Sequence, residues 1–108
     1  MFRVTFAPTA LRSWESLPRS AQRKFNQAFT AMTRNPRQAS VDLDVHQLRG
    51  YRNLWTLRIP PFRGIYVIEG TEVVLIVFGH RELVYSRLHG LLPPEGRSVS
   101  TSGLARRR

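Results

Sequence analysis

Two hydrophobic periodicities divide the chain into an N-terminal helical part and a longer strand-rich part. Residues 2–6 alternate apolar and polar side chains, which is the pattern of a strand with one buried face. From residue 10 to residue 32 the apolar residues recur every three or four positions instead, which predicts helices. Because Leu17-Pro18 interrupts this pattern and Asn35-Pro36 ends it, we expect two helices joined by a short turn.

Strand patterns return after the helices and continue to residue 79. The expected strands cover residues 45–48, 53–59, 62–69 and 72–79. The last of these is almost wholly apolar, as expected for a central strand covered on both faces. Pro60-Pro61 and Glu69-Gly70-Thr71 supply the two turns between the last three strands, which therefore read as an antiparallel meander.

The order β-α-α-β-β-β-β predicts an α+β fold. We expect an N-terminal strand, a helical hairpin and an antiparallel sheet, with both helices packed on one face and the other face partly open. Residues 82–92 predict a short closing helix. The folded domain is expected over residues 1–92, and residues 93–108 predict a flexible basic tail because their Pro, Gly, Ser and Arg content cannot build a core.

The charge of the chain points to an anionic partner. Lys and Arg total 17 against 7 Asp and Glu, so the formal net charge is +10, and Lys24 is the only lysine. Nucleic acid, an anionic membrane surface or an acidic protein could each explain this excess. Arginine favours the first, because its planar guanidinium forks onto phosphate oxygens.

Other classes of chemistry have no support in the sequence. The chain has no cysteine, which excludes disulfides, thiol catalysis and thiolate metal sites. Its His, Asp and Glu residues show no metal-ligand spacing, so neither a metal nor another cofactor is expected. No apolar run is long enough for a signal peptide or a membrane span, which makes a cytoplasmic protein the expectation.

Four residues of the strand-rich part are the candidate catalytic groups. Side-chain alternation places Arg58 on the face opposite Trp55, Leu57 and Ile59, which suit the core against the helices. The four candidates are Arg58, Arg63, Arg81 and Tyr85. Arg58 and Arg63 flank the Pro60-Pro61 turn and could hold one phosphate between them. Arg81 follows the apolar strand, and a helical turn after it would fold Tyr85 back over the same hollow.

Each candidate also has an ordinary structural explanation. Arg58 could be a solvated strand residue and Tyr85 an aromatic at the edge of the core. Arg63 could pair with Glu69 or Glu72, and Arg81 with Glu82 or Glu15. Three further residues are candidates for RNA binding, namely His80, Arg49 and Arg52. His80 could instead be a structural histidine, and Arg49 and Arg52 could simply extend a basic surface. Only the joint placement of these residues favours a site.

The motifs together resemble the RelE/ParE superfamily of toxins from type II toxin–antitoxin pairs. The resemblance covers about residues 2–90 and is carried most strongly by Phe62-Arg-Gly-Ile-Tyr66 and by Gly79-His-Arg-Glu-Leu-Val-Tyr85. Closeness to the RelE branch implies an endoribonuclease that cleaves mRNA in the ribosomal A site and is held by an antitoxin, which we expect to be acidic.

The resemblance also implies roles for individual residues. Arg63 and Arg81 would contact the scissile phosphate, and Tyr85 would stack on the nucleotide or assist proton transfer. Arg58 stands at a position that is basic in the family. Thr56 stands at a second position that is basic in the family and is a candidate RNA contact, but it supplies no cation there. The general base is therefore left unassigned.

Two further functions remain open. A ParE-like toxin would inhibit DNA gyrase without cutting RNA; that branch usually lacks the late tyrosine, so Tyr85 and Arg63 favour the nuclease. A non-catalytic RNA-binding regulator is the other alternative, favoured by Thr56 and by the lack of a clear base.

Overall fold

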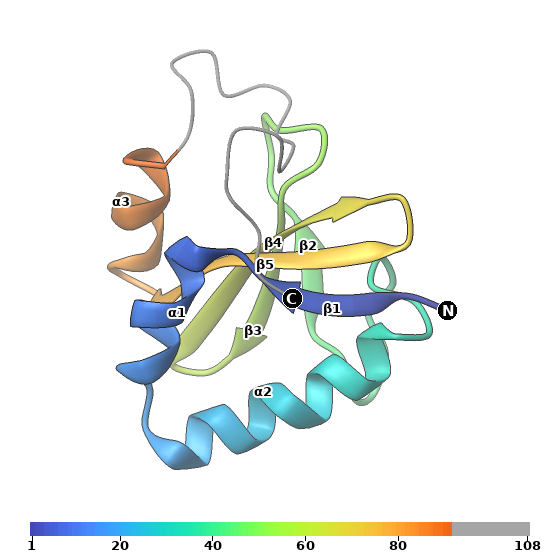
Figure 1. Ribbon diagram of the computed structural model, residues 1–108, viewed down its shortest axis with the longest axis horizontal. Coiled ribbons are helices and arrows are strands. Elements are labelled where there is room, and N and C mark those ends of the chain that lie inside the picture. The colour runs from blue at the N-terminus through green and yellow to red at the C-terminus, as the bar shows by residue number, and fades with distance from the viewer. Residues whose placement is uncertain (92–108) are drawn as a thin grey trace.

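A five-stranded sheet with helices on both sides forms the described part of the computed structural model, residues 1–91 (Figure 1). The elements in chain order are β1 (Arg3–Phe6), α1 (Pro8–Glu15), α2 (Arg19–Met32), β2 (Val45–Gln47), β3 (Trp55–Ile59), β4 (Phe62–Glu69), β5 (Glu72–His80) and α3 (Val84–His89). The predicted α+β fold and element order are confirmed. The predicted tail, residues 93–108, lies outside the described residues.

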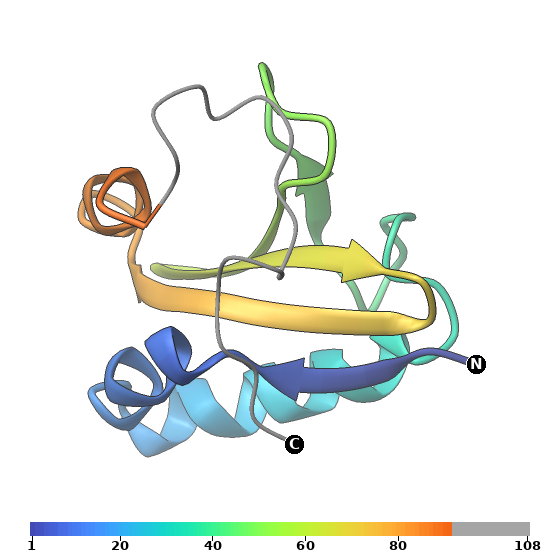
Figure 2. The same ribbon diagram turned by 45° about the horizontal axis from the view of Figure 1, so that its top comes forward.

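The sheet has the order β1-β5-β4-β3-β2. Strands β2 to β5 form the predicted antiparallel meander. The prediction of a wholly antiparallel sheet was wrong at β1, which runs parallel to β5 with Arg3 opposite Glu72 and Phe6 opposite Leu75 (Figure 2). Alternation shows which residues share a face, but it carries no information about the direction of a partner strand that lies far along the chain.

One face of the sheet carries the larger core, beneath α1 and α2. Ala10 of α1 and Phe25 and Met32 of α2 pack with Leu57 of β3 and Phe78 of β5. Aromatic rings form the centre of this core, with Trp14 and Phe78 centroids 5.0 Å apart and Phe25 and Phe78 centroids 5.1 Å apart. Both helices therefore lie on one face, as predicted, and the predicted inward face of β3 is confirmed.

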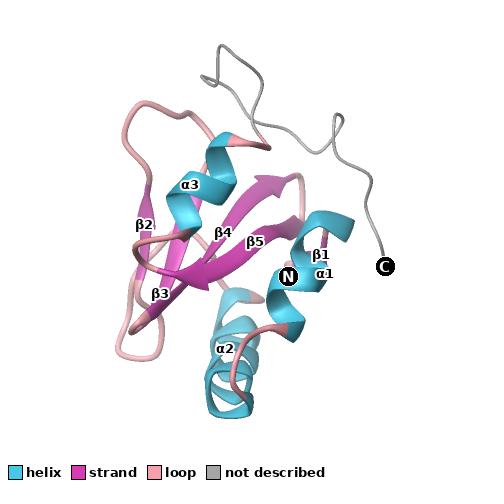
Figure 3. Ribbon diagram, turned by 90° about the vertical axis from the view of Figure 1, so that its left-hand side faces the viewer, coloured by secondary structure: helices cyan, strands magenta, loops and turns pink. Residues whose placement is uncertain are grey.

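The opposite face carries a second core, part of which α3 covers (Figure 3). Val84 and Leu88 anchor α3 there. The sheet contributes Leu54, Ile65, Val67, Val74, Ile76 and Val77. The helix is shorter than the predicted 82–92. It does not cover the end of the sheet near the β3–β4 turn, where the residues line a hollow.

A bulge in β5 changes which residues face this second core. Ile65 pairs with Val77 and Tyr66 with Leu75, so Ile76 is an extra residue on β5. Ile76 and Val77 both pack in the second core, and Phe78 returns to the helix side. From this point the alternation is reversed, which places Gly79 opposite Arg63 and puts Arg81, two residues later, on the face that carries Arg63.

Helix α1 satisfies the edge of β5 beyond the end of β1. The Thr9 hydroxyl donates to the Ile76 carbonyl at 2.8 Å. The Ser13 hydroxyl accepts the Phe78 N–H at 3.0 Å and donates to the Ala10 carbonyl at 3.1 Å. Two hydroxyls thus replace the strand that is missing along this stretch, where buried backbone groups would otherwise be unpaired.

None of the helices in the described part of the chain has the length and apolar character that crossing a bilayer requires.

Candidate active site

Two arginines lie directly opposite each other at the end of the sheet that is closed by the Pro60-Pro61 turn. Arg58 on β3 is the cross-strand partner of Arg63 on β4, so both side chains leave the same face, the one that carries α3. Like charges in such a pair repel each other, and an anion between them removes the repulsion. Arg58 and Arg63 therefore form a built site for a negatively charged group.

Asp44 holds Arg58 from the edge of the sheet. The Arg58 backbone N–H donates to the Asp44 carbonyl at 2.9 Å, which continues the β2–β3 pairing one position past β2. The Arg58 Nε also donates to Asp44 Oδ2 at 3.1 Å. Because a guanidinium has five N–H donors and this contact uses one, the fork of Arg58 is still able to receive phosphate oxygens.

The same carboxylate also contacts a histidine. Asp44 Oδ1 lies 2.9 Å from His46 Nε2, and the side chains of both residues are about half exposed. His46 is on β2, opposite Thr56 and on the same face as Asp44. Arg58, Asp44 and His46 thus form a connected cluster beside the arginine pair.

Tyr85 completes the cluster from α3. Arg63 Nη1 donates to the Tyr85 hydroxyl at 2.5 Å, and both side chains are partly buried. The helix can place Tyr85 here because Val84, immediately before it, is fully buried against the sheet. The phenol therefore has a fixed position next to the anion site.

Arg81 reaches the site from the loop after β5. Its backbone N–H donates to the Pro61 carbonyl at 3.0 Å, which ties this loop to the β3–β4 turn. Arg81 is exposed, and within residues 1–91 neither Arg81 nor Arg63 forms an ion pair with an acidic side chain. The alternative pairing of Arg63 with Glu72 is not observed, since Glu72 is paired with Arg3 at 3.0 Å.

A hollow of about 260 Å³ lies between these groups. Its lining residues are Asp44, Arg58, Pro60, Pro61, Phe62, Arg63 and Arg81. Three guanidinium groups and one carboxylate line this small space, so its net charge is positive. The structure therefore brings together all four candidate catalytic residues, with Tyr85 bonded to the wall of the hollow.

The other four candidates lie elsewhere. Thr56 is only 2% exposed and its hydroxyl is buried, so its side chain does not lie on the surface, where the predicted RNA contact would require it. His80 stacks edge-on against Phe62, which packs on the helix-side core, and its Nδ1 accepts the Glu82 N–H. These contacts agree with the structural explanation of His80.

Arg49 and Arg52 are exposed in the loop between β2 and β3. This loop precedes β3, whereas Arg58 lies near the end of that strand, so the two arginines flank the far end of the sheet face. Neither lines the hollow. Their contribution to RNA binding stays a prediction about the surrounding surface.

Two members of the site were not predicted from the sequence. The sequence patterns singled out neither Asp44 nor His46 as a candidate. Their link to Arg58 depends on the β2–β3 register, for which the three residues of β2 give little sequence signal. The alternating spacing of Asp44 and His46 was the one available indication that they share a face.

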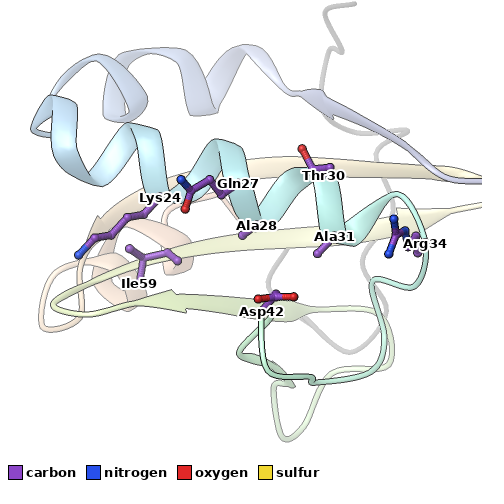
Figure 4. A pocket seen from close by; sticks show the side chains of 8 residues that line it. All are labelled: Lys24, Gln27, Ala28, Thr30, Ala31, Arg34, Asp42 and Ile59. Carbon is purple, nitrogen blue, oxygen red and sulfur yellow. The ribbon is translucent and has the colours of Figure 1, made fainter.

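A second and larger hollow, of about 630 Å³, separates α2 from β3 (Figure 4). Lys24, Ala28 and Arg34 line it from the helix side, and Ile59 and Asp42 line it from the other side. It shares no lining residue with the arginine hollow. Its mixed charges do not converge on one point as the three arginines do.

A metal centre has no support in the described residues, because residues 1–91 contain no group of three His, Asp or Glu side chains that could hold an ion. Burial raises the pKa of the Tyr66 phenol well above its usual value, and the charge of Arg37 opposes this shift. Tyr66 lies in the helix-side core, so this shift belongs to the fold rather than to the arginine hollow.

Comparison with known proteins gives a family and a set of similar folds. Residues 4–85 match the family model described as the ParE toxin of the type II toxin–antitoxin system parDE. No curated protein sequence matches the chain.

Solved structures with the same fold include RelE toxins, free or with their antitoxins. A mutant of the Escherichia coli toxin RelE in the free state has a TM-score of 0.69 at 19% identity, covering 85% of this chain and 98% of that chain. The RelB–RelE complex of Methanococcus jannaschii has a TM-score of 0.64 at 17% identity, covering 75% and 94%. The RelBE2 complex of Mycobacterium tuberculosis has a TM-score of 0.60 at 24% identity, covering 74% and 98%.

These structures share the fold, and the family model covers most of the chain, including the four candidate residues of the hollow. The resemblance to the RelE/ParE superfamily is confirmed, and the chain belongs to the ParE toxin family of type II toxin–antitoxin systems.

Proposed function

We propose that this toxin is an endoribonuclease that cleaves mRNA, in the setting of the translating ribosome, and thereby inhibits translation. The observation that carries the proposal is the convergence of Arg58, Arg63 and Arg81 on one hollow, with Tyr85 bonded to Arg63. Similarity in fold to RelE toxins is consistent with it. Arginine suits this task because it stays charged at every physiological pH and binds phosphate with two parallel hydrogen bonds.

RNA carries its own nucleophile, so the protein needs to supply position, charge and proton transfer. The 2′-hydroxyl attacks the adjacent phosphorus, the bond to the 5′-oxygen breaks, and the products end in a 2′,3′-cyclic phosphate and a 5′-hydroxyl. Negative charge builds up on the phosphate oxygens during this step. Arg63 and Arg81 would bind those oxygens, and fixed donors of this kind lower the barrier by about 3 kcal/mol each.

Tyr85 would serve the leaving group. Its hydroxyl accepts a hydrogen bond from Arg63 and therefore has its own proton free to donate. A phenol held in this way can donate that proton to the departing 5′-oxygen. The guanidinium groups supply the charge that a metal ion would otherwise provide, so the reaction is proposed to need no metal.

The proposal includes an antitoxin partner. A net charge of +10 on 108 residues favours an acidic segment that competes with RNA for the basic surface. Several proteins with this fold were solved as toxin–antitoxin complexes. Such a pair acts where ribosomes are, so the cytoplasm is the proposed location.

The test is induced expression of the chain followed by mapping of mRNA 5′ ends. We expect growth arrest and new 5′ ends within translated regions, and no such ends when the hollow is disabled by Arg63→Ala. Intact mRNA with growth arrest would contradict the ribonuclease proposal.

Inhibition of DNA gyrase is the second candidate, because the matching family model is that of ParE toxins. The same cultures distinguish the two functions. Broken DNA with intact mRNA would establish the gyrase function, whereas absence of any growth effect would leave the non-catalytic RNA-binding regulator.

A further inference from the structure

We propose that His46 is the general base of the cleavage reaction and that Asp44 positions it. This inference rests on the proposed ribonuclease function and completes it, because the arginines and Tyr85 leave the 2′-hydroxyl proton without an acceptor. Guanidinium groups remain protonated and cannot take it. The position at which the resemblance implied a cation holds the buried Thr56 instead.

The sheet register places His46 beside the anion site. Asp44, Arg58 and Arg63 form one row across β2, β3 and β4, and His46 begins the next row on the same face, opposite Thr56. Asp44 connects the rows, with one oxygen 3.1 Å from Arg58 Nε and the other 2.9 Å from His46 Nε2. The proposed base, His46, and the proposed phosphate ligand, Arg58, therefore contact the two oxygens of the same carboxylate.

Asp44 also determines which nitrogen of His46 is basic. An ionised carboxylate only accepts hydrogen bonds, so the Nε2 that faces it carries the hydrogen. The lone pair is then on Nδ1, for which the described residues provide no hydrogen-bond partner. A carboxylate that fixes the tautomer and orientation of an imidazole in this way is a recurrent arrangement for proton transfer.

Asp44 itself is a poorer acceptor than His46. Both of its oxygens already interact with donors, one on Arg58 and one on His46, so neither is left free to take the proton of the 2′-hydroxyl. The imidazole does not line the hollow itself, but it is half exposed and contacts Asp44, which does. Imidazole is also the side chain best suited to gain and lose a proton near neutral pH.

The step balances with groups of this chain. His46 Nδ1 takes the proton from the 2′-hydroxyl as the 2′-oxygen bonds to phosphorus. The bond from phosphorus to the 5′-oxygen breaks, and the 5′-oxygen takes the Tyr85 proton. His46 then carries one extra proton and Tyr85 lacks one, and exchange with water restores both before the next reaction.

The test uses the purified full-length chain, translating ribosomes and a defined mRNA, with single-turnover cleavage as the readout. We expect His46→Ala to lower the cleavage rate about 100-fold, the usual contribution of a general base, without changing RNA affinity or the unfolding midpoint. Added imidazole should restore part of that rate. His89→Ala is the matched control, because His89 is an exposed histidine on α3 and is not the histidine that contacts Asp44.

Two further variants separate a proton acceptor from a structural histidine. His46→Gln keeps a group that can donate to Asp44 but cannot act as a base, so it should be as slow as His46→Ala. Asp44→Asn leaves the imidazole misplaced, so cleavage should slow and added imidazole should not restore it.

The possible results lead to different conclusions. Wild-type rates in His46→Ala or His46→Gln, or a slow His46→Ala that imidazole fails to rescue, would overturn the assignment of the base while leaving the ribonuclease in place. Intact mRNA with the wild-type chain would overturn the ribonuclease itself, and this inference with it.

Discussion

Arg81 is the least restrained of the three arginines in the hollow. Arg58 is held by Asp44 and Arg63 by Tyr85, whereas Arg81 is fixed through its backbone and its side chain is exposed. In the proposed reaction its guanidinium would therefore be available to bind the phosphate oxygens as their charge increases. A group with few contacts in the folded protein also contributes little to stability, so function and fold can be separated at this residue.

We expect Arg81→Ala to lower the rate of mRNA cleavage by at least about tenfold, because it removes one charged donor to the transition state. The midpoint of thermal unfolding should not change. Arg19→Ala, which removes an exposed arginine of α2 on the opposite side of the sheet, should cleave at close to the wild-type rate. A purified Arg81→Ala protein that is unfolded would instead show a structural role.

At the residue scale, the sequence predicted the cations of the site but not the groups that position them. Arg58, Arg63, Arg81 and Tyr85 could be brought together from alternation and turns, because each lies within a few residues of a strong strand signal. Asp44 and His46 could not, because their contact with Arg58 requires the register of a three-residue strand. Burial of Thr56 was also missed, since it depends on packing across the sheet.

At the scale of the elements, the edge of β5 is satisfied by two hydroxyls of α1, and only that of Ser13 accepts a backbone N–H. Ser13 is buried, and it is the partner that accepts the Phe78 N–H. The position looks unremarkable in the sequence, as one polar residue on an amphipathic helix. Its importance comes from the end of β1 at Phe6, after which β5 has no strand on that side.

Ser13→Ala should therefore destabilise the fold by about 2 kcal/mol, because it leaves a buried backbone N–H without an acceptor. Urea unfolding followed by circular dichroism would measure this loss. The control is Ser16→Ala, which removes an exposed hydroxyl that bonds to the Arg12 carbonyl and should cost much less. Equal stability of the two variants would show that the Phe78 N–H finds another partner.

Tyr66 links β4 to the end of the helical hairpin. Its hydroxyl donates to the Pro36 carbonyl at 2.5 Å, and burial raises the pKa of this phenol. The folded protein thus holds the Tyr66 proton at pH values where the unfolded chain, with a pKa of about 10, releases it. The contribution of Tyr66 is complete below that pKa and is lost as the pH rises through the higher folded value.

The free energy of unfolding should therefore fall as the pH is raised above about 10, and Tyr66→Phe should weaken this fall. Near pH 8 the same substitution should cost about 1 kcal/mol for the lost hydrogen bond. Denaturant titrations at both pH values would measure these differences. Tyr51→Phe serves as the control, and an equally steep alkaline loss in Tyr66→Phe would refute the assignment to Tyr66.

At this scale the sequence predicted every strand and helix and the antiparallel meander of β2 to β5, but not every detail of strand pairing. Strand boundaries differ by at most two residues from the expected ranges for β3, β4 and β5. The parallel pairing of β1 and the bulge at Ile76 were missed. The bulge matters for the site, because without it Arg81 would follow the strand alternation to the helix side of the sheet.

The whole molecule presents a large positive charge to any polyanion, and part of that charge belongs to residues 93–108. Their removal takes away four arginines and one glutamate, so the net charge falls from +10 to +7. Both cores are composed of residues within 1–91. We propose that the segment adds long-range attraction for RNA and is not needed for the fold.

Removal of residues 93–108 should leave the unfolding midpoint unchanged and weaken binding to single-stranded RNA. The logarithm of the binding constant should also depend less steeply on the logarithm of the salt concentration, by about 0.7 for each lost phosphate contact. Fluorescence anisotropy titrations at several salt concentrations would measure this slope. The control is the 108-residue chain with serine in place of those four arginines, which should bind RNA like the shortened chain. If the unfolding midpoint fell in the shortened chain but not in this control, the segment would be shown to support the fold.

The parallel pairing of β1 with β5 has a consequence for how the protein is made. Arg3 is opposite Glu72 in this pairing, so β1 is synthesised well before β5, the strand with which it pairs. Until β5 has emerged, the N-terminal helices have no complete sheet to pack on, and Arg81 and Tyr85, which come later still, have not joined the hollow. In the proposed function, a nascent chain would therefore lack the complete hollow until residues 81–85 have been made.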